Sequence, residues 1–290
     1  MLKRLMMTGA AVLASTTIAL ADRSHSCDGL PHWSELKAAV TAAVGQSNGG
    51  LAFNMWATLV ANDGTVCAVA FSGKNFTNQW LASRVISAQK ANTANGLSLG
   101  KDSNMPGASL FPTGLALSTA NLYAAVQPGG SLYGLQFSNP VDPSDAYLQR
   151  NGQPDNPADF GTDHDPMVGR PIGGVNVFGG GLGLYRDGVK IGGVGVSGDT
   201  SCTDHFVAWR VRNTLGLDQL GTLVGGVAGV FVHDTTHPDN IIFDIPATPD
   251  VPGNIAGNVG VSKSGFGHPQ CLNGLTDPTV LPPVTGPGAH

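Results

Sequence analysis

The sequence predicts an α+β domain in which helices pack against a central antiparallel β-sheet. Two hairpins indicate this sheet: apolar runs at 51–61 and 66–71 flank an Asn-Asp-Gly turn at 62–64, and a second pair surrounds an Arg-Asp-Gly turn at 186–188. Helical segments are interleaved with the hairpins, without the regular strand–helix alternation of a parallel sheet.

Apolar residues at helical spacing predict four helices, the first capped by Ser34 and the second followed by Gly96. These helices span residues 34–46, 80–95, 118–126 and 201–215. The strand that returns from the second hairpin is expected at 191–196, and a last strand is expected at 241–245.

The N-terminus has the three regions of a secretory signal peptide. Lys3 and Arg4 precede a mostly apolar stretch over 5–18, and Ala19-Leu20-Ala21 is a small-x-small cleavage site. We therefore expect residues 1–21 to be removed and the mature chain to begin near Asp22, in the periplasm or outside the cell. Later apolar runs are all interrupted and too short to span a bilayer.

The remaining chain is expected to form one domain over 22–275. A stretch rich in Gly, Pro, Asn and Asp at 127–171 is expected to be a loop insertion or a functional loop. The Pro-rich residues 276–290 are expected to form a flexible tail.

The charge balance excludes two classes of partner. The net charge is −5, charged residues make up only 12% of the chain, and Lys and Arg are not clustered. Nucleic acids and anionic membrane surfaces both require a basic face, so neither is expected to bind.

An even number of cysteines in an exported chain predicts two disulfides. The four are Cys27, Cys67, Cys202 and Cys271. Three pairings are possible; we favour Cys27 with Cys271, which would join the ends of the domain, and Cys67 with Cys202. A metal site built from these thiols is a weaker alternative.

Residues 193–198 match the dinucleotide-binding pattern G-x-G-x-x-G. The preceding strand is the second arm of a hairpin rather than the start of a βαβ unit, so we do not favour a nucleotide site. Ser197 is followed by Gly198 and Asp199, which does not encode the sharp nucleophile turn of an α/β-hydrolase.

Two loop clusters of His and Asp could bind a divalent ion. They comprise Asp163, His164 and Asp165, and His233, Asp234, His237 and Asp239. Both lie in Pro-containing segments where solvated polar residues are expected anyway, and we favour that interpretation.

His205 follows Asp204 in the first turn of the helix predicted at 201–215. A helix N-terminus disfavours the imidazolium, so this side chain should be neutral and able to offer a lone pair to iron. A capping or packing role is the alternative.

Two blocks of the sequence resemble the GlcG/HbpS-like haem-binding family, whose members are also called haem-degrading domains. Residues 88–94 (AQKANTA) are similar to the family's Lys-Ala-x-Thr-Ala helix. The second block runs from Gly173 through the segment 192–198 (GGVGVSG) to Asp204 and Ala208, and is similar to the family's paired-glycine strand, Ser-Gly turn and Asp-containing helix. The turn at 62–64 also lies where the family has an Asp-x-x-Gly turn.

The resemblance implies an α+β domain with a central antiparallel sheet, often assembled into homo-oligomers. It implies haem or a related tetrapyrrole as the ligand, or a small organic acid. The chain departs from the family at His205, where an acidic residue is commoner, and in the segment 127–171, the extension after Leu217 and the cysteines.

A haem site needs an axial ligand, an apolar slot and groups that meet the propionates. The resemblance makes His205 the candidate axial ligand, with His268 in reserve. Lys90 and Arg84 are candidates for the propionates, and Thr93 for a nearby hydrogen bond. The remaining candidate haem-contacting residues are Asp204, Ser197 and Gly198.

Three functions are consistent with the sequence. We favour an exported protein that carries, scavenges or senses haem. The alternatives are an enzyme that degrades haem oxidatively or acts as a peroxidase, and a module of the same fold that binds a small ligand or a partner protein without haem. The sequence contains no acid/base constellation that would indicate turnover.

Overall fold

The computed structural model describes residues 25–103, 111–221, 226–230, 234–245 and 262–286. The predicted signal peptide and its cleavage site therefore lie outside the described residues. Within them, no helix has the length and apolar character needed to cross a membrane.

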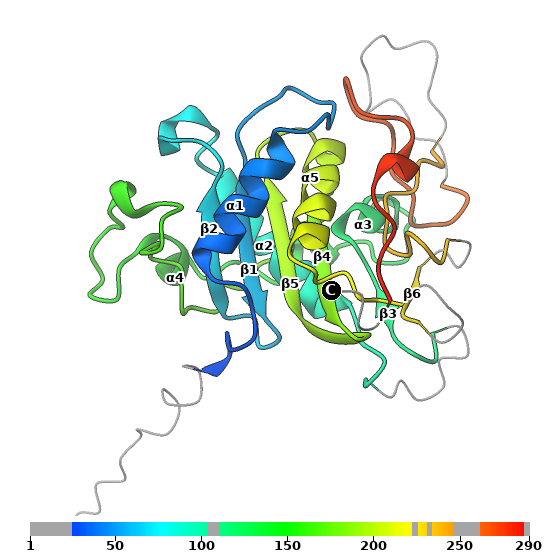
Figure 1. The fold of residues 1–290 in the computed structure, drawn as a ribbon, viewed down its shortest axis with the longest axis horizontal. Helices are drawn as coiled ribbons and strands as arrows, with labels where there is room; N and C mark the ends of the chain where they lie inside the picture. Colours follow the sequence, from blue (N-terminus) through cyan, green and yellow to red (C-terminus); the bar gives the residue numbers. More distant parts are fainter. Residues whose placement is uncertain (1–24, 104–110, 222–225, 231–233, 246–261, 287–290) are drawn as a thin grey trace, which may run out of the picture.

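A four-stranded antiparallel sheet with the strand order β2-β1-β5-β4 forms the centre of the domain (Figure 1). The strands are β1 (Trp56–Ala61), β2 (Val66–Phe71), β4 (Gly181–Arg186) and β5 (Val189–Ser197). The two predicted hairpins are confirmed, with Asp187 and Gly188 at positive φ in the second turn. Pairing of β1 with β5 joins the two hairpins into one sheet.

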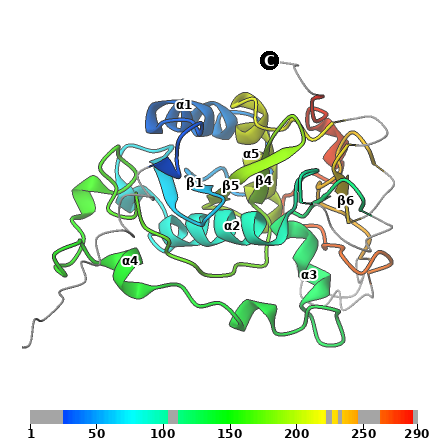
Figure 2. The same cartoon turned by 90° about the horizontal axis from the view of Figure 1, so that it is seen from below.

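Helices cover both faces of this sheet, as the view from below shows (Figure 2). The helix α2 (Ser83–Leu97) lies on one face, and α1 (Trp33–Val44) and α5 (Ser201–Thr214) lie side by side on the other. Apolar side chains on both faces of the strands are buried, which forms two hydrophobic cores. The α+β prediction, with a central antiparallel sheet flanked by helices, is confirmed.

Glycines in β5 allow α2 to approach the sheet closely. A Cβ atom at Gly195 would lie 1.9 Å from the Ser87 carbonyl oxygen, and one at Gly193 would lie 2.4 Å from the Ala91 carbonyl oxygen. No side chain fits at such distances. The glycine pattern at 193–198 therefore serves helix–sheet packing, in agreement with our preference against a nucleotide site.

The other elements are short. They are η2 (Phe76–Asn78), β3 (Leu115–Ala116), η3 (Thr119–Asn121), α3 (Leu122–Ala125), η4 (Leu135–Phe137), α4 (Pro143–Tyr147), η5 (Pro157–Asp159), β6 (Ala228–Gly229) and η6 (Pro278–Val280). β3 and β6 pair in parallel as a second, two-stranded sheet that the sequence analysis did not predict. The segment 127–171 contains three of the one-turn helices and runs past the outer side of α2 (Figure 2).

Two expectations for the C-terminal part are wrong. Residues 241–245 form no strand, because the Ile241 amide bonds to the Asn240 side chain and the Ile242 carbonyl accepts from the His268 amide. Residues 276–286 are not a free tail: Leu281 and Val284 are buried against the core. Apolar side chains spaced between the prolines supply this burial, which the composition alone did not indicate.

Candidate functional site

Lys90 and Asp204 meet beneath the N-terminus of α5 and form a fully buried ion pair. Lys90 Nζ lies 2.6 Å from Asp204 Oδ2 and also donates to the Val196 carbonyl oxygen at 3.0 Å. The Phe178 ring lies 4.0 Å from the same ammonium group. Burial lowers the pKa of Lys90 and raises the pKa of Asp204, while the charge of each partner opposes both shifts.

Asp204 also orders the turn that leads into α5. Its second oxygen, Oδ1, accepts the Asp199 amide at 2.8 Å, and Thr200 caps the helix by accepting the Thr203 amide. The ion pair thus connects α2, the end of β5 and the start of α5.

Arg84, nearly two turns from Lys90 along α2, and Thr93, about one turn from it, are also fully engaged. Arg84 forms a bidentate ion pair with buried Asp165, with Nε–Oδ2 and Nη2–Oδ1 distances of 2.9 and 2.5 Å. Thr93 Oγ1 donates to the Gln89 carbonyl oxygen and accepts the Asn176 amide. Both cations that we expected near propionates are therefore paired with carboxylates of the chain.

His205 is fully buried on the side of α5 that faces Asn240 and Ile241. Its Nε2 lies 3.0 Å from Asn240 Oδ1 and 3.1 Å from the Ile241 amide nitrogen, whereas Nδ1 has no hydrogen-bond partner. Burial lowers the pKa of His205 to about 4, so the imidazole is neutral. In the tautomer in which Nε2–H donates to Asn240 Oδ1, the Ile241 amide donates to the same oxygen at 2.8 Å, and Nδ1 keeps a lone pair with no partner.

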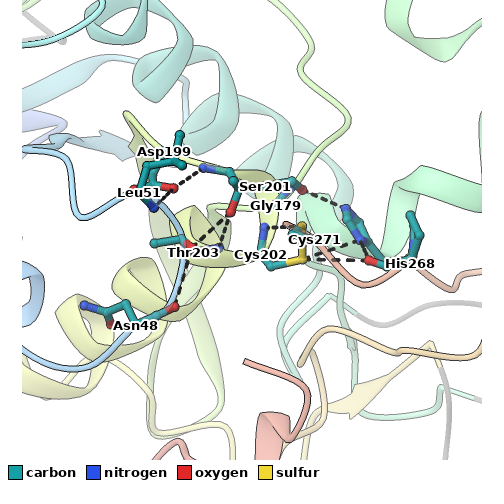
Figure 3. Close-up of a disulfide and its surroundings, with 11 residues drawn as sticks. Asn48, Leu51, Gly179, Asp199, Ser201, Cys202, Thr203, His268 and Cys271 are labelled. Atoms are coloured by element: carbon teal, nitrogen blue, oxygen red, sulfur yellow. Dashed lines mark hydrogen bonds between the residues drawn. A yellow bond between two sulfur atoms is a disulfide. The ribbon is translucent and has the colours of Figure 1, made fainter. Parts of the chain in front are cut away.

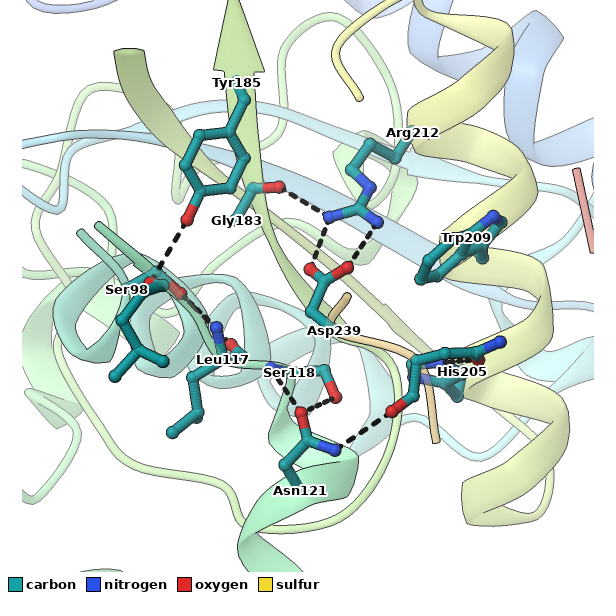
Figure 4. Close-up of polar contacts among 12 residues, drawn as sticks. Ser98, Leu117, Ser118, Asn121, Gly183, Tyr185, His205, Trp209, Arg212 and Asp239 are labelled. Carbon is teal, nitrogen blue, oxygen red and sulfur yellow. Dashed lines mark hydrogen bonds and ion pairs between the residues drawn. The ribbon is translucent and has the colours of Figure 1, made fainter. Parts of the chain in front are cut away.

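The segment that covers His205 is held to α5 by a second buried ion pair (Figure 4). Arg212 Nη1 and Nη2 lie 2.5 and 2.8 Å from the two oxygens of Asp239, and Nη1 also donates to the Gly183 carbonyl oxygen. Asn121 Nδ2 donates to the Asn240 carbonyl oxygen. The sequence analysis did not single out Arg212, Asn121 or Asn240; Asp239 appeared there only as part of a loop cluster.

Ser197 and Gly198 end β5 within the packed core. Ser197 is 2% exposed, and the Gly198 carbonyl oxygen accepts from Gln79 Nε2 at 2.8 Å. A Cβ atom at Gly198 would lie 2.7 Å from the Asn54 carbonyl oxygen, so a glycine is needed at this crossing.

The disulfides pair Cys27 with Cys67 and Cys202 with Cys271, which overturns the pairing that we favoured. The prediction that all four cysteines form two disulfides is confirmed. Each bond fastens a segment of little regular structure to a core element: the N-terminal turn to β2, and the C-terminal segment to α5. The spacing of the cysteines along the sequence does not indicate which of them are close together in the fold.

His268 lies beside the second disulfide, where the sequence placed it, and is 2% exposed (Figure 3). Its Nδ1 lies 2.6 Å from the Pro269 carbonyl oxygen, and its Nε2 lies 2.7 Å from Ser201 Oγ. Nδ1–H donates to Pro269, which leaves Nε2 to accept from the Ser201 hydroxyl. Burial lowers the pKa of His268 to about 4.

The loop clusters do not assemble as ion sites among the described residues. Asp165 and Asp239 are taken by the two buried arginines. His237 bonds to the Leu281 carbonyl oxygen, and His164 is exposed. His233 lies outside the described residues.

A small cavity of about 50 Å³ lies between the end of α1 and the start of α5. It is lined on one side by Phe53 and Met55, and on the other by Asp199 and Thr203. The Asp199 carboxylate accepts the Leu51 amide at its mouth. This volume is enough for a few water molecules and is far too small for a tetrapyrrole.

The donor chemistry at His205 fits haem iron, because a neutral imidazole with a free lone pair is the commonest protein ligand of this kind. The surrounding packing is closed: all seven residues predicted to contact haem are buried. A macrocycle at His205 therefore requires the segment around Asn240 to move away from α5.

No protein-family model matches the chain, and no curated protein matches it. Among solved structures, a PduOC:haem complex aligns with 22% identity and a TM-score of 0.38, covering 62% of this chain and 89% of the other. The Klebsiella pneumoniae protein ORFY, of the DUF336 family, aligns with 22% identity and a TM-score of 0.37, covering 73% of this chain and 97% of the other.

Proposed function

We propose that the protein binds haem, or a related tetrapyrrole, with His205 as the axial ligand of the iron. The observation that carries the proposal is the buried, neutral imidazole whose Nδ1 has no partner. An unsatisfied buried ring nitrogen costs free energy, and a ligand that used its lone pair would recover that cost. Three aromatic or apolar side chains next to it suit a macrocycle: Phe206, Trp209 and Ile241.

Binding requires opening of the cover, which consists of residues 237–241 and the segment 278–284 behind it. The cover has little regular secondary structure and is held by a few identifiable contacts, such as Asn240 Nδ2 with the Pro278 carbonyl oxygen at 3.0 Å. Segments of this kind open at a lower free-energy cost than sheet strands or core helices. Displacing them would expose His205 together with Trp209.

We further propose that the protein acts outside the cytoplasm as a carrier, scavenger or sensor rather than mainly by turnover. Two disulfides suit an oxidising compartment. The N-terminal mass of the secreted protein tests this part: it should correspond to a chain that begins near Asp22. Loss of the Soret band on addition of reductant and oxygen, with release of iron, would instead favour haem degradation.

A haem titration by absorbance tests the central proposal. The mature protein should bind haem saturably with a sharp Soret shift, and His205→Gln, which keeps side-chain volume and a donor for Asn240, should abolish or alter that shift. His164→Gln is the control for removing a histidine, since that exposed side chain lies outside the cover. An unchanged Soret shift in His205→Gln would support haem binding but exclude His205 as the axial ligand. His268 would then be the next histidine to substitute.

A second candidate is a module of this fold that binds a small ligand or a partner without haem. The pairing of Lys90 with Asp204 and of Arg84 with Asp165 favours it, since neither cation is free to meet a propionate. This candidate predicts no haem affinity tighter than micromolar, and indifference to His205→Gln.

A further inference from the structure

Cys202, Cys271 and His268 bring three metal-ligating atoms together at the N-terminus of α5 (Figure 3). The ligand atoms of all three lie within 4.8 Å of one another, and two of the three residues are buried. We propose that reduction of the Cys202–Cys271 disulfide converts this cluster into a Cys₂His site for Zn²⁺ or a similar soft divalent ion.

The distances suit a tetrahedral ion. Cys202 Sγ lies 3.9 Å from His268 Nδ1. Zn–S and Zn–N bonds of about 2.3 and 2.0 Å at tetrahedral angles separate the two ligand atoms by roughly 3.6 Å. The two sulfur atoms, now joined at 2.06 Å, must move apart to roughly 3.8 Å, and the Cα–Cα distance of 5.9 Å between the two cysteines leaves room for this separation.

The proposed conversion requires one external reductant for the disulfide, followed by proton release as the ion binds. A phosphine reductant delivers two electrons to the S–S bond and a water molecule supplies two protons and the oxygen, giving two thiols and a phosphine oxide. Each thiol then loses its proton as it binds the ion. The ion receives two thiolates and one neutral imidazole, and a water molecule occupies the fourth position.

The surroundings favour thiolates and an oriented imidazole. The Cys202 amide, in the first turn of α5, points at Cys271 Sγ at 3.1 Å, and an N–H at a helix N-terminus stabilises a sulfur anion there. When Nδ1 binds the ion, the remaining ring proton is on Nε2, 2.7 Å from Ser201 Oγ. Ser201 Oγ then accepts a hydrogen bond from Nε2–H, which fixes the ring as outer-sphere partners of metal-bound histidines do. The Nδ1–H bond to the Pro269 carbonyl oxygen is given up.

The other disulfide provides an internal control. Cys27 and Cys67 are equally reducible in chemical terms, but no described histidine or carboxylate joins them in such a cluster. Metal binding should therefore depend on one cysteine pair and not on the other.

The experiment is an anaerobic Co²⁺ titration of the mature protein after reduction by a phosphine, followed by displacement with Zn²⁺. We expect one Co²⁺ per chain with thiolate-to-cobalt charge-transfer bands in the reduced protein and none in the oxidised protein. The double variant Cys27→Ser/Cys67→Ser should behave like wild type, and Cys202→Ser/Cys271→Ser should lose the bands.

His268→Ala should weaken Co²⁺ binding more than tenfold, and Ser201→Ala by about 10- to 100-fold, as for other second-layer partners. Circular dichroism shows whether each variant is folded, and His268→Gln replaces His268→Ala where the smaller side chain unfolds the protein. Absence of the bands in folded, reduced Cys27→Ser/Cys67→Ser overturns the proposal. Equal affinity in His268→Ala, or bands that survive in Cys202→Ser/Cys271→Ser, also overturns it. None of these outcomes depends on whether the protein binds haem.

Discussion

Lys90 Nζ lies 2.6 Å from Asp204 Oδ2, with neither side chain exposed to solvent. The pair connects α2, which covers one face of the sheet, to the first turn of α5, which covers the other. The pair lies at the end of β5, whose Val196 carbonyl oxygen also accepts from Lys90. A charge in this position needs its partner, because bulk water cannot replace it.

Removal of one member of this pair should therefore destabilise the protein strongly. We expect Lys90→Met to lower the free energy of unfolding by about 3–5 kcal/mol, since it leaves Asp204 buried without a counter-ion. The double variant Lys90→Met/Asp204→Asn should recover part of that loss, because the asparagine can still accept the Asp199 amide. Urea unfolding of both single variants and the double variant measures the coupling; additive effects would show that the pair does not interact energetically.

Acidification should destabilise the protein through two buried histidines. Burial lowers the pKa values of His205 and His268 from 6.5 to about 4. Between pH 6.5 and pH 4 the unfolded chain therefore binds protons that the folded chain refuses, so stability is present above this window and is lost as the pH falls through it. At pH 5 each histidine should reduce the free energy of unfolding by about 2 kcal/mol relative to neutral pH.

Urea unfolding at pH 7.5 and pH 5 measures this loss. His205→Gln and His268→Gln should each make the pH dependence shallower. His164→Gln, which changes an exposed side chain, is the control for removing a histidine. A pH dependence that is the same in all three variants would contradict the assignment to the buried pair.

The two disulfides should protect different parts of the chain. Each closes a loop of 40 or 69 residues, for which chain entropy predicts a similar stabilisation of about 4 kcal/mol. Of the two disulfides, only Cys202–Cys271 ties the segment 262–286 to the core, and this segment contains a single 3₁₀ turn among its described elements. We expect Cys202→Ser/Cys271→Ser to become sensitive to proteolysis within that segment.

Limited proteolysis with mass-spectrometric mapping of the cleavage sites checks this difference. Cys27→Ser/Cys67→Ser should instead be cleaved near its N-terminus, and should keep 262–286 protected. Cleavage of both variants at the same places would mean that the bonds act only through global stability.

The parts of the fold that sequence predicts well are those specified by neighbouring residues. The turns at 62–64 and 186–188 define two hairpins, and apolar spacing defines α1, α2 and α5, because all of these signals lie within one element. The join between β1 and β5 and the second sheet of β3 and β6 depend on contacts between distant residues. The same limit explains the wrong disulfide pairing.

The sequence predicts which residues belong to the candidate site better than it predicts how these residues contact one another. Lys90 and Asp204 come from separate blocks of sequence and do meet. They pair with each other, so neither charge is free to bind a ligand. Asp165, expected as a solvated loop residue, is buried because Arg84 reaches it from α2. Asn240 and Ile241, which contact His205, lie in a segment whose apolar run predicts a strand, so nothing in the sequence indicated their role.

The C-terminal segment should control access to His205. Leu281 and Val284 are each 2% exposed, the Trp209 indole donates to the Pro282 carbonyl oxygen at 2.8 Å, and Asn240 is tied to Pro278. Leu281→Ala removes part of this packing and should lower the free energy of global unfolding by about 2–5 kcal/mol. The loss should be smaller if the segment opens independently of the rest of the domain. Hydrogen exchange should become faster at the Ile241 amide, which now bonds to Asn240 Oδ1.

Val280→Ala is the matched control, because Val280 lies next to Leu281 but is 53% exposed. If haem reaches His205 by displacement of this segment, Leu281→Ala should also bind haem faster than wild type, since the competent open state becomes more populated. Stopped-flow absorbance at the Soret band measures that rate. Faster exchange at Ile241 without faster haem association would show that the cover opens but does not gate the ligand, and would place the haem site elsewhere on the molecule.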